Sequence, residues 1–321
     1  MEIQDKLKKS LPLWVAIFVL VGLSQLLTVF SEKGISKEPQ AIVEPEETSP
    51  KVLGVSTEIR GGESESESSI KQIGEPDLSD INAKSFLVFD LDTGTEFFQK
   101  ESRKQLGIAS LTKLMTALVA YKNSDLNQSF TITGRDIYKV NPVLGLEAGD
   151  QVKALDVFNA MLVGSDNDAA LALANFVATS TDENFIELMN RQAKSLGLNN
   201  SHFSNALGFD SQYNYSTAED LKILIQETQK LAAFTNLGRR TSYDFVGSLG
   251  KTYSAEATNK LLSQYPDLYA VKTGYTQYAL GAMAVKLKIG DHFIVILVLG
   301  SEDREGDVLK LRDKINKNFV W

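Results

Sequence analysis

The sequence predicts an α+β fold in which one antiparallel sheet, built from both ends of the folded part, packs against a helical subdomain. One transmembrane helix is expected to precede this fold. Three observations lead to the prediction. Strand-like runs occur near both ends of the folded part, segments with helical periodicity occupy its middle, and a long uncharged apolar stretch lies close to the N-terminus.

The apolar stretch covers residues 11–30, LPLWVAIFVLVGLSQLLTVF. About 20 apolar residues are needed to cross the hydrocarbon core of a bilayer. Three lysines precede the stretch and Glu32 follows it, so the positive-inside rule places residues 1–10 in the cytoplasm and the rest outside. A cleaved signal peptide is the alternative, but its apolar region is usually shorter and ends in a small-x-small site. We therefore expect a single-pass protein of the cell membrane whose folded part is extracytoplasmic.

Residues 31–80 are predicted to form an acidic, disordered linker. They contain twelve acidic and five basic side chains and include the run ESESESS at 63–69. A segment so rich in charge and so poor in apolar residues cannot bury a core. The folded domain is accordingly predicted to span residues 81–321.

The first and last parts of this domain have the pattern of strands. Residues 83–100 consist of two apolar runs around Asp92-Thr93-Gly94, which predicts a hairpin. Three further strands are expected at Leu268–Thr276, Gly281–Lys288 and His292–Leu299, followed by a closing helix over 303–319. The clearest helical signals lie between the two groups of strands, at Leu111–Tyr121, Ala154–Leu162, Ala169–Ala178, Glu183–Ser195 and Ala218–Leu231.

Composition excludes several classes of protein. The chain has no cysteine, which rules out disulfides, thiolate metal sites and a cysteine nucleophile. Its only histidines, His202 and His292, are far apart, so a metal site is not expected. The net charge is -8 and no basic stripe is present, which argues against nucleic-acid binding.

Ser110 and Lys113 form a Ser-x-x-Lys motif in the segment SLTKLMTALVAY. The same pattern begins at Ser68 and Ser248, but Ser68 lies in the predicted linker and Ser248 in the glycine-flanked stretch GSLGK. Apolar residues surround Lys113 on almost every helical face, which predicts a buried helix, and burial lowers the pKa of a lysine. A neutral amine can act as a general base, and residues three apart share a helix face, so Lys113 is a candidate base for Ser110. The alternative is a serine N-cap followed by a lysine whose amine reaches water.

The tripeptide Ser165-Asp166-Asn167 interrupts two apolar helical segments and is the only Ser-x-Asn in the chain. Small polar side chains between buried helices cost free energy unless they are satisfied. A plain helix–helix joint, with Gly164 as C-cap and Ser165 as N-cap, would explain them. A polar site is the other interpretation, with Ser165 and Asn167 as its candidate residues.

The tripeptide Lys272-Thr273-Gly274 lies in the strand-like run LYAVKTGYT and also occurs once. A cation, a hydroxyl and a residue without a side chain could together bind a carboxylate at a strand edge, because glycine lets a ligand backbone approach closely. An exposed strand end is the alternative interpretation.

These three motifs, in this order, resemble the hallmark of penicillin-binding proteins and serine β-lactamases. Segments such as IASLTKLMTALV, SDNDAALALA and VKTGYT look like the low-molecular-mass D-alanyl-D-alanine carboxypeptidases, and the similarity covers about residues 83–300. The resemblance implies a penicillin-binding-protein/β-lactamase-like fold. It also implies a serine-type carboxypeptidase that removes the terminal D-Ala from peptidoglycan stem peptides, is acylated by β-lactam antibiotics and uses no cofactor or metal.

The resemblance also implies a role for each motif residue. Ser110 would be the nucleophile, Lys113 its base and Ser165 a proton relay to the leaving D-Ala. Asn167 would bind the substrate backbone, and the backbone N–H groups of Ser110 and Tyr275 would form an oxyanion hole. The strand residues Lys272, Thr273 and Gly274 would bind the terminal carboxylate and line the substrate path.

Some features depart from the family pattern or leave alternatives open. Asp166 stands where Gly or Ala is usual in this branch, and Ala206 replaces a common proline. A D,D-endopeptidase or a β-lactamase on the same scaffold is the enzymatic alternative, and a wall-binding pseudoenzyme is the non-enzymatic one. A β-lactamase needs a carboxylate to activate water. Glu187 in FIELMNRQA resembles such a residue, but its amphipathic surroundings favour a solvated position.

Overall fold

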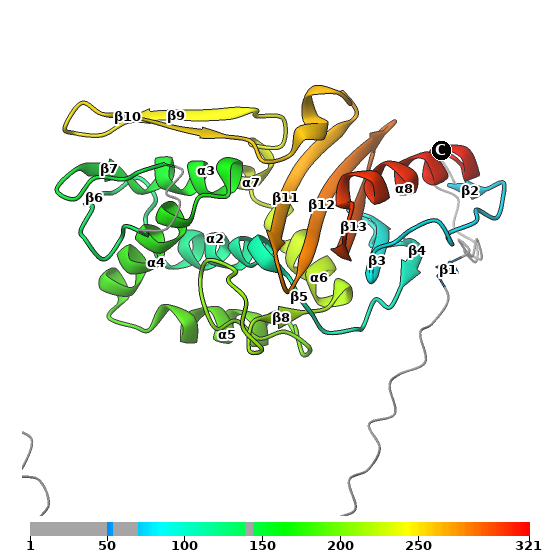
Figure 1. Cartoon of the computed structure of the whole chain (residues 1–321), viewed down its shortest axis with the longest axis horizontal. Helices are drawn as coiled ribbons and strands as arrows, with labels where there is room; N and C mark the ends of the chain where they lie inside the picture. Colours follow the sequence, from blue (N-terminus) through cyan, green and yellow to red (C-terminus); the bar gives the residue numbers. More distant parts are fainter. Residues whose placement is uncertain (1–49, 54–69, 139–143) are drawn as a thin grey trace, which may run out of the picture. The chain divides into compact units, whose positions relative to one another are not determined.

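A six-stranded antiparallel sheet forms the centre of the fold, and its strands come from both ends of the described chain (Figure 1). The computed structural model describes residues 50–53, 70–138 and 144–321. Along the sheet the order is β1-β4-β3-β13-β12-β11. These strands are β1 (Lys51–Val52), β3 (Ser85–Asp90), β4 (Glu96–Lys100), β11 (Leu268–Thr276), β12 (Leu280–Ile289) and β13 (His292–Ser301).

Both faces of the sheet are buried, because apolar side chains alternate between them along the central strands. On β3, Leu87 and Phe89 belong to the core shared with the helical subdomain. Their neighbours Phe86 and Val88 belong to a second core on the opposite face, which α8 (Arg304–Asn318) closes. The sheet therefore separates two apolar layers. Figure 1 shows α8 lying along one side of the sheet.

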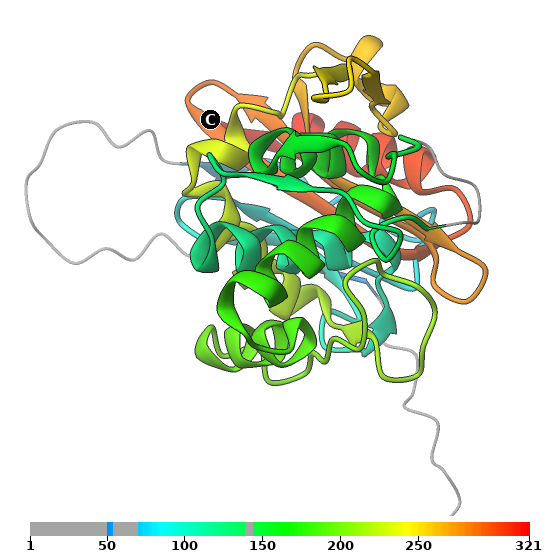
Figure 2. The same cartoon turned by 90° about the vertical axis from the view of Figure 1, so that its left-hand side faces the viewer.

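The helical subdomain lies between the two groups of strands in the sequence. It packs on the face of the sheet opposite α8, and Figure 2 shows its green helices seen from the left-hand side of Figure 1. Its helices are α2 (Thr112–Asn123), α3 (Ala154–Gly164), α4 (Asn167–Thr181), α5 (Phe185–Ser195), α6 (Ala218–Gln229) and α7 (Ala232–Thr235).

Short strands and turns complete the described structure. The short strand pairs β5–β8 and β6–β7 lie in and beside the helical subdomain. A longer hairpin, β9–β10, lies next to α3 (Figure 1). The elements are β2 (Lys71–Gln72), β5 (Leu106–Gly107), β6 (Ser129–Thr131), β7 (Gln151–Lys153), β8 (Tyr215–Ser216), β9 (Ser242–Val246), β10 (Thr252–Glu256) and β14 (Phe319–Val320), with the 3₁₀ turns η1 (Ala109–Leu111) and η2 (Lys260–Ser263).

The predicted α+β fold is confirmed, because strands from both chain ends form one antiparallel sheet against a helical subdomain. All predicted helices and strands of the domain are present, with ends that differ by a few residues. The predicted transmembrane segment, 11–30, lies outside the described residues. None of the helices in the described part combines the length and the apolarity that a membrane span requires.

The end of the predicted linker, residues 70–80, belongs to the folded domain. Lys71–Gln72 pairs with β14, and Lys51–Val52 pairs with β4 at the edge of the sheet. Leu78 is buried in the core beneath α8. The charged composition of 31–80 concealed these short pairings, because each contributes only two residues to a sheet.

Candidate active site

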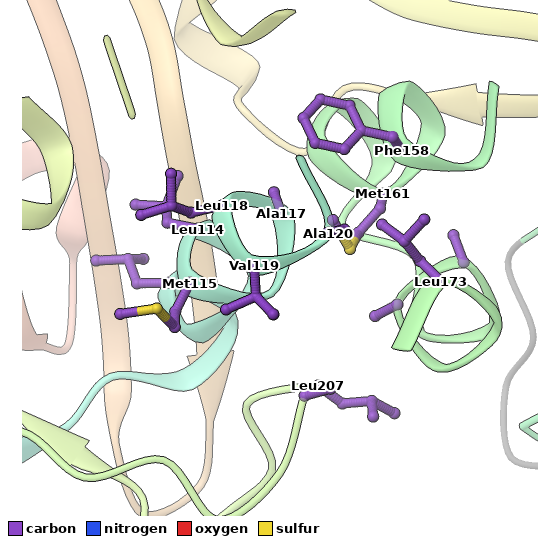
Figure 3. Packing of buried hydrophobic residues seen from close by; sticks show 14 of the residues in the cluster. Leu114, Met115, Ala117, Leu118, Val119, Ala120, Phe158, Met161, Leu173 and Leu207 are labelled. Atoms are coloured by element: carbon purple, nitrogen blue, oxygen red, sulfur yellow. The ribbon is translucent and has the colours of Figure 1, made fainter. Parts of the chain in front are cut away.

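Helix α2 carries the first motif into the centre of the molecule. Every residue from Thr112 to Ala120 is buried. Figure 3 shows Leu114 and Leu118 facing the strands, while Ala120 lies near Met161 of α3 and Leu173 of α4. The side chain of Lys113 is fully buried within this apolar packing, so the prediction of a buried lysine is confirmed and the water-reaching alternative is wrong.

Three oxygen atoms surround the amine of Lys113. Its Nζ lies 3.0 Å from Ser110 Oγ, 3.0 Å from Asn167 Oδ1 and 2.6 Å from the carbonyl oxygen of Leu207. The first contact joins residues one helical turn apart, and the other two reach α4 and the segment before β8. The first two motifs therefore meet at this one nitrogen.

Burial lowers the pKa of Lys113 to about 7, against a smaller opposing effect of the Asp166 carboxylate. A neutral amine has only two hydrogens, yet Asn167 Oδ1 and the Leu207 carbonyl can only accept. When Lys113 is neutral and both of these contacts persist, its lone pair therefore faces the Ser110 hydroxyl, which must donate. This is the arrangement that lets an amine take the proton of an attacking hydroxyl.

The second motif forms a tight turn between α3 and α4. Ser165 has a left-handed backbone with φ of 57°, and Asp166 is the N-cap of α4, since its carboxylate accepts from Ala169 N at 2.7 Å. The caps thus lie one residue later than the plain-joint interpretation placed them. Gly164 is the last residue of α3 and packs closely on β10, since a Cβ there would lie 2.9 Å from Ala255 Cβ. A left-handed non-glycine residue is uncommon and occurs both at helix ends and at functional sites.

Lys272 joins the third motif to the second. Its Nζ donates to Ser165 Oγ at 2.6 Å and to the Thr273 carbonyl at 2.9 Å. Burial lowers the pKa of Lys272 well below its usual range, and the charges of Lys113 and Arg304 lower it further. Repulsion from Lys113 therefore adds to the effect of burial on Lys272, whereas burial is the cause of the low pKa of Lys113.

Strand β11 is the edge strand of the sheet and lies directly against the Ser110 backbone. A Cβ on Gly274 would stand 2.6 Å from Ser110 N and 2.9 Å from Ala109 Cβ. Only glycine permits this approach. Tyr275 follows on the same strand, so its N–H and that of Ser110 belong to adjoining backbone segments, where a pair of donors can serve an oxyanion.

Two further side chains support β11 at this point, and the sequence analysis did not identify either. Arg304, at the start of α8, donates to the Gly274 carbonyl at 2.6 Å. Thr258 shares a 2.5 Å hydrogen bond with the hydroxyl of Thr273. The position of Arg304 in the charged run SEDREG gave no signal, because its contact partner lies 30 residues away.

The segment before β8, residues 205–209, forms the remaining side of the site. The sequence analysis did not identify it either. Asn205 Oδ1 accepts from the backbone N–H groups of Leu207, Gly208 and Phe209. This turn presents the Leu207 carbonyl to Lys113. Gly208 packs so closely that a Cβ would lie 2.0 Å from the carbonyl oxygen of Ala109.

Other candidate residues lie outside the site. Ser248 donates to Asp150 and Lys251 reaches the Gly145 carbonyl, so the last Ser-x-x-Lys stabilises a turn. Glu187 is exposed on α5. The two histidines contact the Tyr213 carbonyl and Asp90. Within the described residues, no group of three His, Cys, Asp or Glu side chains could hold a metal ion.

Known proteins resemble this chain over the part that contains the three motifs. A family model described as D-alanyl-D-alanine carboxypeptidase matches residues 70–303. The chain is 30% identical to D-alanyl-D-alanine carboxypeptidase DacF of Bacillus subtilis over 240 residues, which are 72% of this chain and 61% of DacF. It is 31% identical to DacC of Escherichia coli over 237 residues, 69% of this chain and 57% of DacC. The chain therefore spans less than two thirds of the length of these curated relatives.

A solved structure has the same fold. A serine-to-alanine mutant of the Streptomyces K15 DD-transpeptidase superposes with a TM-score of 0.69 at 27% identity. The match covers 76% of this chain and 100% of that protein. Because the family model covers most of the chain, including all three motifs, the protein belongs to the D-alanyl-D-alanine carboxypeptidase family.

Proposed function

We propose that this protein is a membrane-anchored serine-type D-alanyl-D-alanine carboxypeptidase that removes the terminal D-Ala from peptidoglycan stem peptides and is acylated by β-lactams. The observation that carries the proposal is the buried amine of Lys113, 3.0 Å from Ser110 Oγ. Its family membership supports the same activity.

Acylation begins when Ser110 Oγ attacks the carbonyl carbon of the penultimate D-Ala and passes its proton to neutral Lys113. General-base catalysis of this kind is worth about 10²–10⁴-fold in rate. The negative charge that develops on the carbonyl oxygen is met by the N–H groups of Ser110 and Tyr275. Such a pair of donors lowers the barrier by several kcal/mol.

The leaving D-Ala takes its proton from the Ser165 hydroxyl as the C–N bond breaks. Ser165 can recover a proton from Lys272, whose Nζ lies 2.6 Å from Ser165 Oγ. Lys272 and Thr273 hold the terminal carboxylate, and Asn167 binds the substrate backbone. Water then hydrolyses the ester on Ser110 and releases the shortened peptide.

Among the described residues, the β-lactamase alternative lacks a carboxylate placed to activate water. Rapid hydrolysis of a penicilloyl ester needs a carboxylate that activates water, and Glu187 is exposed on the outer side of α5. The neighbouring Asn190 is held by the backbone of Phe203. A D,D-endopeptidase would use the same chemistry on a cross-linked peptide, so cleavage of matched linear and cross-linked substrates separates these two activities.

Membrane anchorage is proposed from the sequence of residues 11–30 and the lysines that precede them. The test is to fractionate bacteria that express the full chain. We expect the protein in the membrane fraction after an alkaline wash and its release by detergent. Leu20→Lys should weaken membrane retention, because a charge at the centre of a span costs about 3 kcal/mol. A soluble mature chain that begins after residue 30 would instead establish a cleaved signal peptide.

The activity is tested by intact-mass spectrometry after exposure to penicillin, together with D-Ala release from a stem pentapeptide. We expect one covalent adduct on Ser110 in the wild type, none in Ser110→Ala, and D-Ala release by the wild type alone. An adduct at another serine would overturn the site. Absence of both adduct and release would favour the pseudoenzyme.

A further inference from the structure

Asp210 lies at the end of the β11 edge, where it contacts Thr276 and Tyr278. It comes two residues after Gly208, which packs on the Ala109 carbonyl. Its carboxylate accepts from the hydroxyl of Thr276 at 2.5 Å and from Tyr278 N at 3.2 Å. Thr276 in turn comes two residues after Gly274, which packs on Ser110 N. Two short backbone paths therefore lead from Ser110 to the same carboxylate.

This carboxylate is exposed and carries an uncompensated charge. Among the ion pairs of the described residues, none involves Asp210. Each of its oxygens accepts one neutral hydrogen bond and keeps a further lone pair. The hydrogen bonds orient the group, and its charge remains available to a cation that approaches from solvent.

The direction in which the substrate peptide lies decides which of its groups reaches the Asp210 carboxylate. This step rests on the function proposed above. With the terminal carboxylate at Lys272 and Thr273 and the acylated carbonyl at Ser110, the peptide runs antiparallel to β11 along its free edge. The third stem-peptide residue then lies beyond Ser110. Adjacent Cα atoms are about 3.8 Å apart, which places that residue level with Tyr275 and Thr276.

We propose that Asp210 forms a subsite for the side chain of the third stem-peptide residue and selects one that ends in a free, positively charged amine, as a lysine does. The ring of Tyr278, 67% exposed on the same turn, offers an apolar surface to the methylene groups of that side chain. Ion pairs exposed to this degree are worth up to about 1 kcal/mol, so the preference is about three- to fivefold.

The experiment compares kcat/KM for two tripeptides that differ only at the amine. They are Nα-acetyl-L-Lys-D-Ala-D-Ala and its Nε-acetylated form, followed by D-Ala release. The wild type should cleave the free-amine peptide about three- to fivefold better at low salt, and the ratio should approach one at 1 M NaCl, where the Debye length is about 3 Å. Because this salt series uses the wild type alone, it remains decisive if a variant misfolds.

Three variants locate the effect. Asp210→Asn should bring the ratio close to one. Thr276→Val removes the hydrogen bonds of the Thr276 hydroxyl with Asp210 and with the N–H of Ala279 but keeps the charge of Asp210, so the ratio should persist. Asp291→Asn makes the same charge change in the exposed turn at the opposite end of β12 and should leave the ratio intact.

Two failures are distinguishable. Equal, salt-independent cleavage of both peptides by the wild type would overturn the subsite and leave the carboxypeptidase intact. Cleavage of neither peptide, with no penicillin adduct on Ser110, would overturn the proposed function itself.

Discussion

Lys272 Nζ donates a 2.6 Å hydrogen bond to Ser165 Oγ and so joins the edge strand to the turn between α3 and α4. Lys113 makes the corresponding contact with Ser110 at 3.0 Å. The site thus contains two pairs of a buried amine and a hydroxyl. In the proposed reaction one pair serves the attacking oxygen and the other the leaving group. Each pair can be tested separately.

Ser165→Ala should slow acylation by penicillin by at least about 100-fold, because the leaving amine loses its proton donor. Ser248→Ala is the matched control, since Ser248 also begins a Ser-x-x-Lys but contacts Asp150 in a distant turn. Stopped-flow acylation rates measure both variants. Equal rates for Ser165→Ala and the wild type would remove Ser165 from the relay.

The acylation rate should rise with pH around neutrality. Burial lowers the pKa of Lys113 to about 7, and only the deprotonated amine can accept the Ser110 proton. The rate constant should therefore be small below pH 6, half-maximal near pH 7 and level above pH 8. A midpoint near 10, the usual range of lysine, would show that burial does not lower the pKa of Lys113.

Asp166→Asn should move this midpoint to lower pH. The Asp166 carboxylate favours the charged form of Lys113 and partly offsets burial, so its removal lowers the pKa and leaves more neutral amine at a given pH. Lys272 also faces the site, and the variant does not alter this residue. The measurement is the midpoint of the acylation profile, which a loss of folded protein does not move.

Asp182→Asn is the matched control for this shift. It removes the same charge at the other end of α4, about 24 Å away at 1.5 Å per residue, in a left-handed position that asparagine tolerates. We expect the wild-type midpoint. A midpoint for Asp166→Asn at or above that of the wild type would contradict the electrostatic role of Asp166.

The elements that the sequence predicted well have long runs and clear periodicity. The continuous apolar runs of β3 and β13 and the all-round apolar character of α2 each reflect burial that a side-chain pattern records. Lys113 was identified for the same reason, since one charge within a buried helix demands a partner.

The features that the sequence analysis missed depend on contacts between distant residues. The β9–β10 hairpin has a weak pattern because only Phe245, Tyr253 and Ala255 are buried along it. The Leu207 carbonyl and the Arg304 guanidinium enter the site through partners 94 and 30 residues away. Backbone acceptors have no signature in a sequence, and a surface arginine is common, so neither could be recognised before the fold was known.

Gly274→Ala should impair the reaction far more than the stability. The added Cβ would meet Ser110 N at 2.6 Å and Ala109 Cβ at 2.9 Å, so β11 and the nucleophile must move apart. A displacement of about 1 Å at reacting groups costs about 100-fold in rate, whereas overpacking costs about 1–3 kcal/mol of folding free energy. Gly134→Ala, where the added Cβ would meet nothing within 4 Å, is the control and should match the wild type. Penicillin acylation rates and thermal unfolding measure the two effects. Wild-type acylation by Gly274→Ala would mean that the approach of β11 to Ser110 does not govern the reaction.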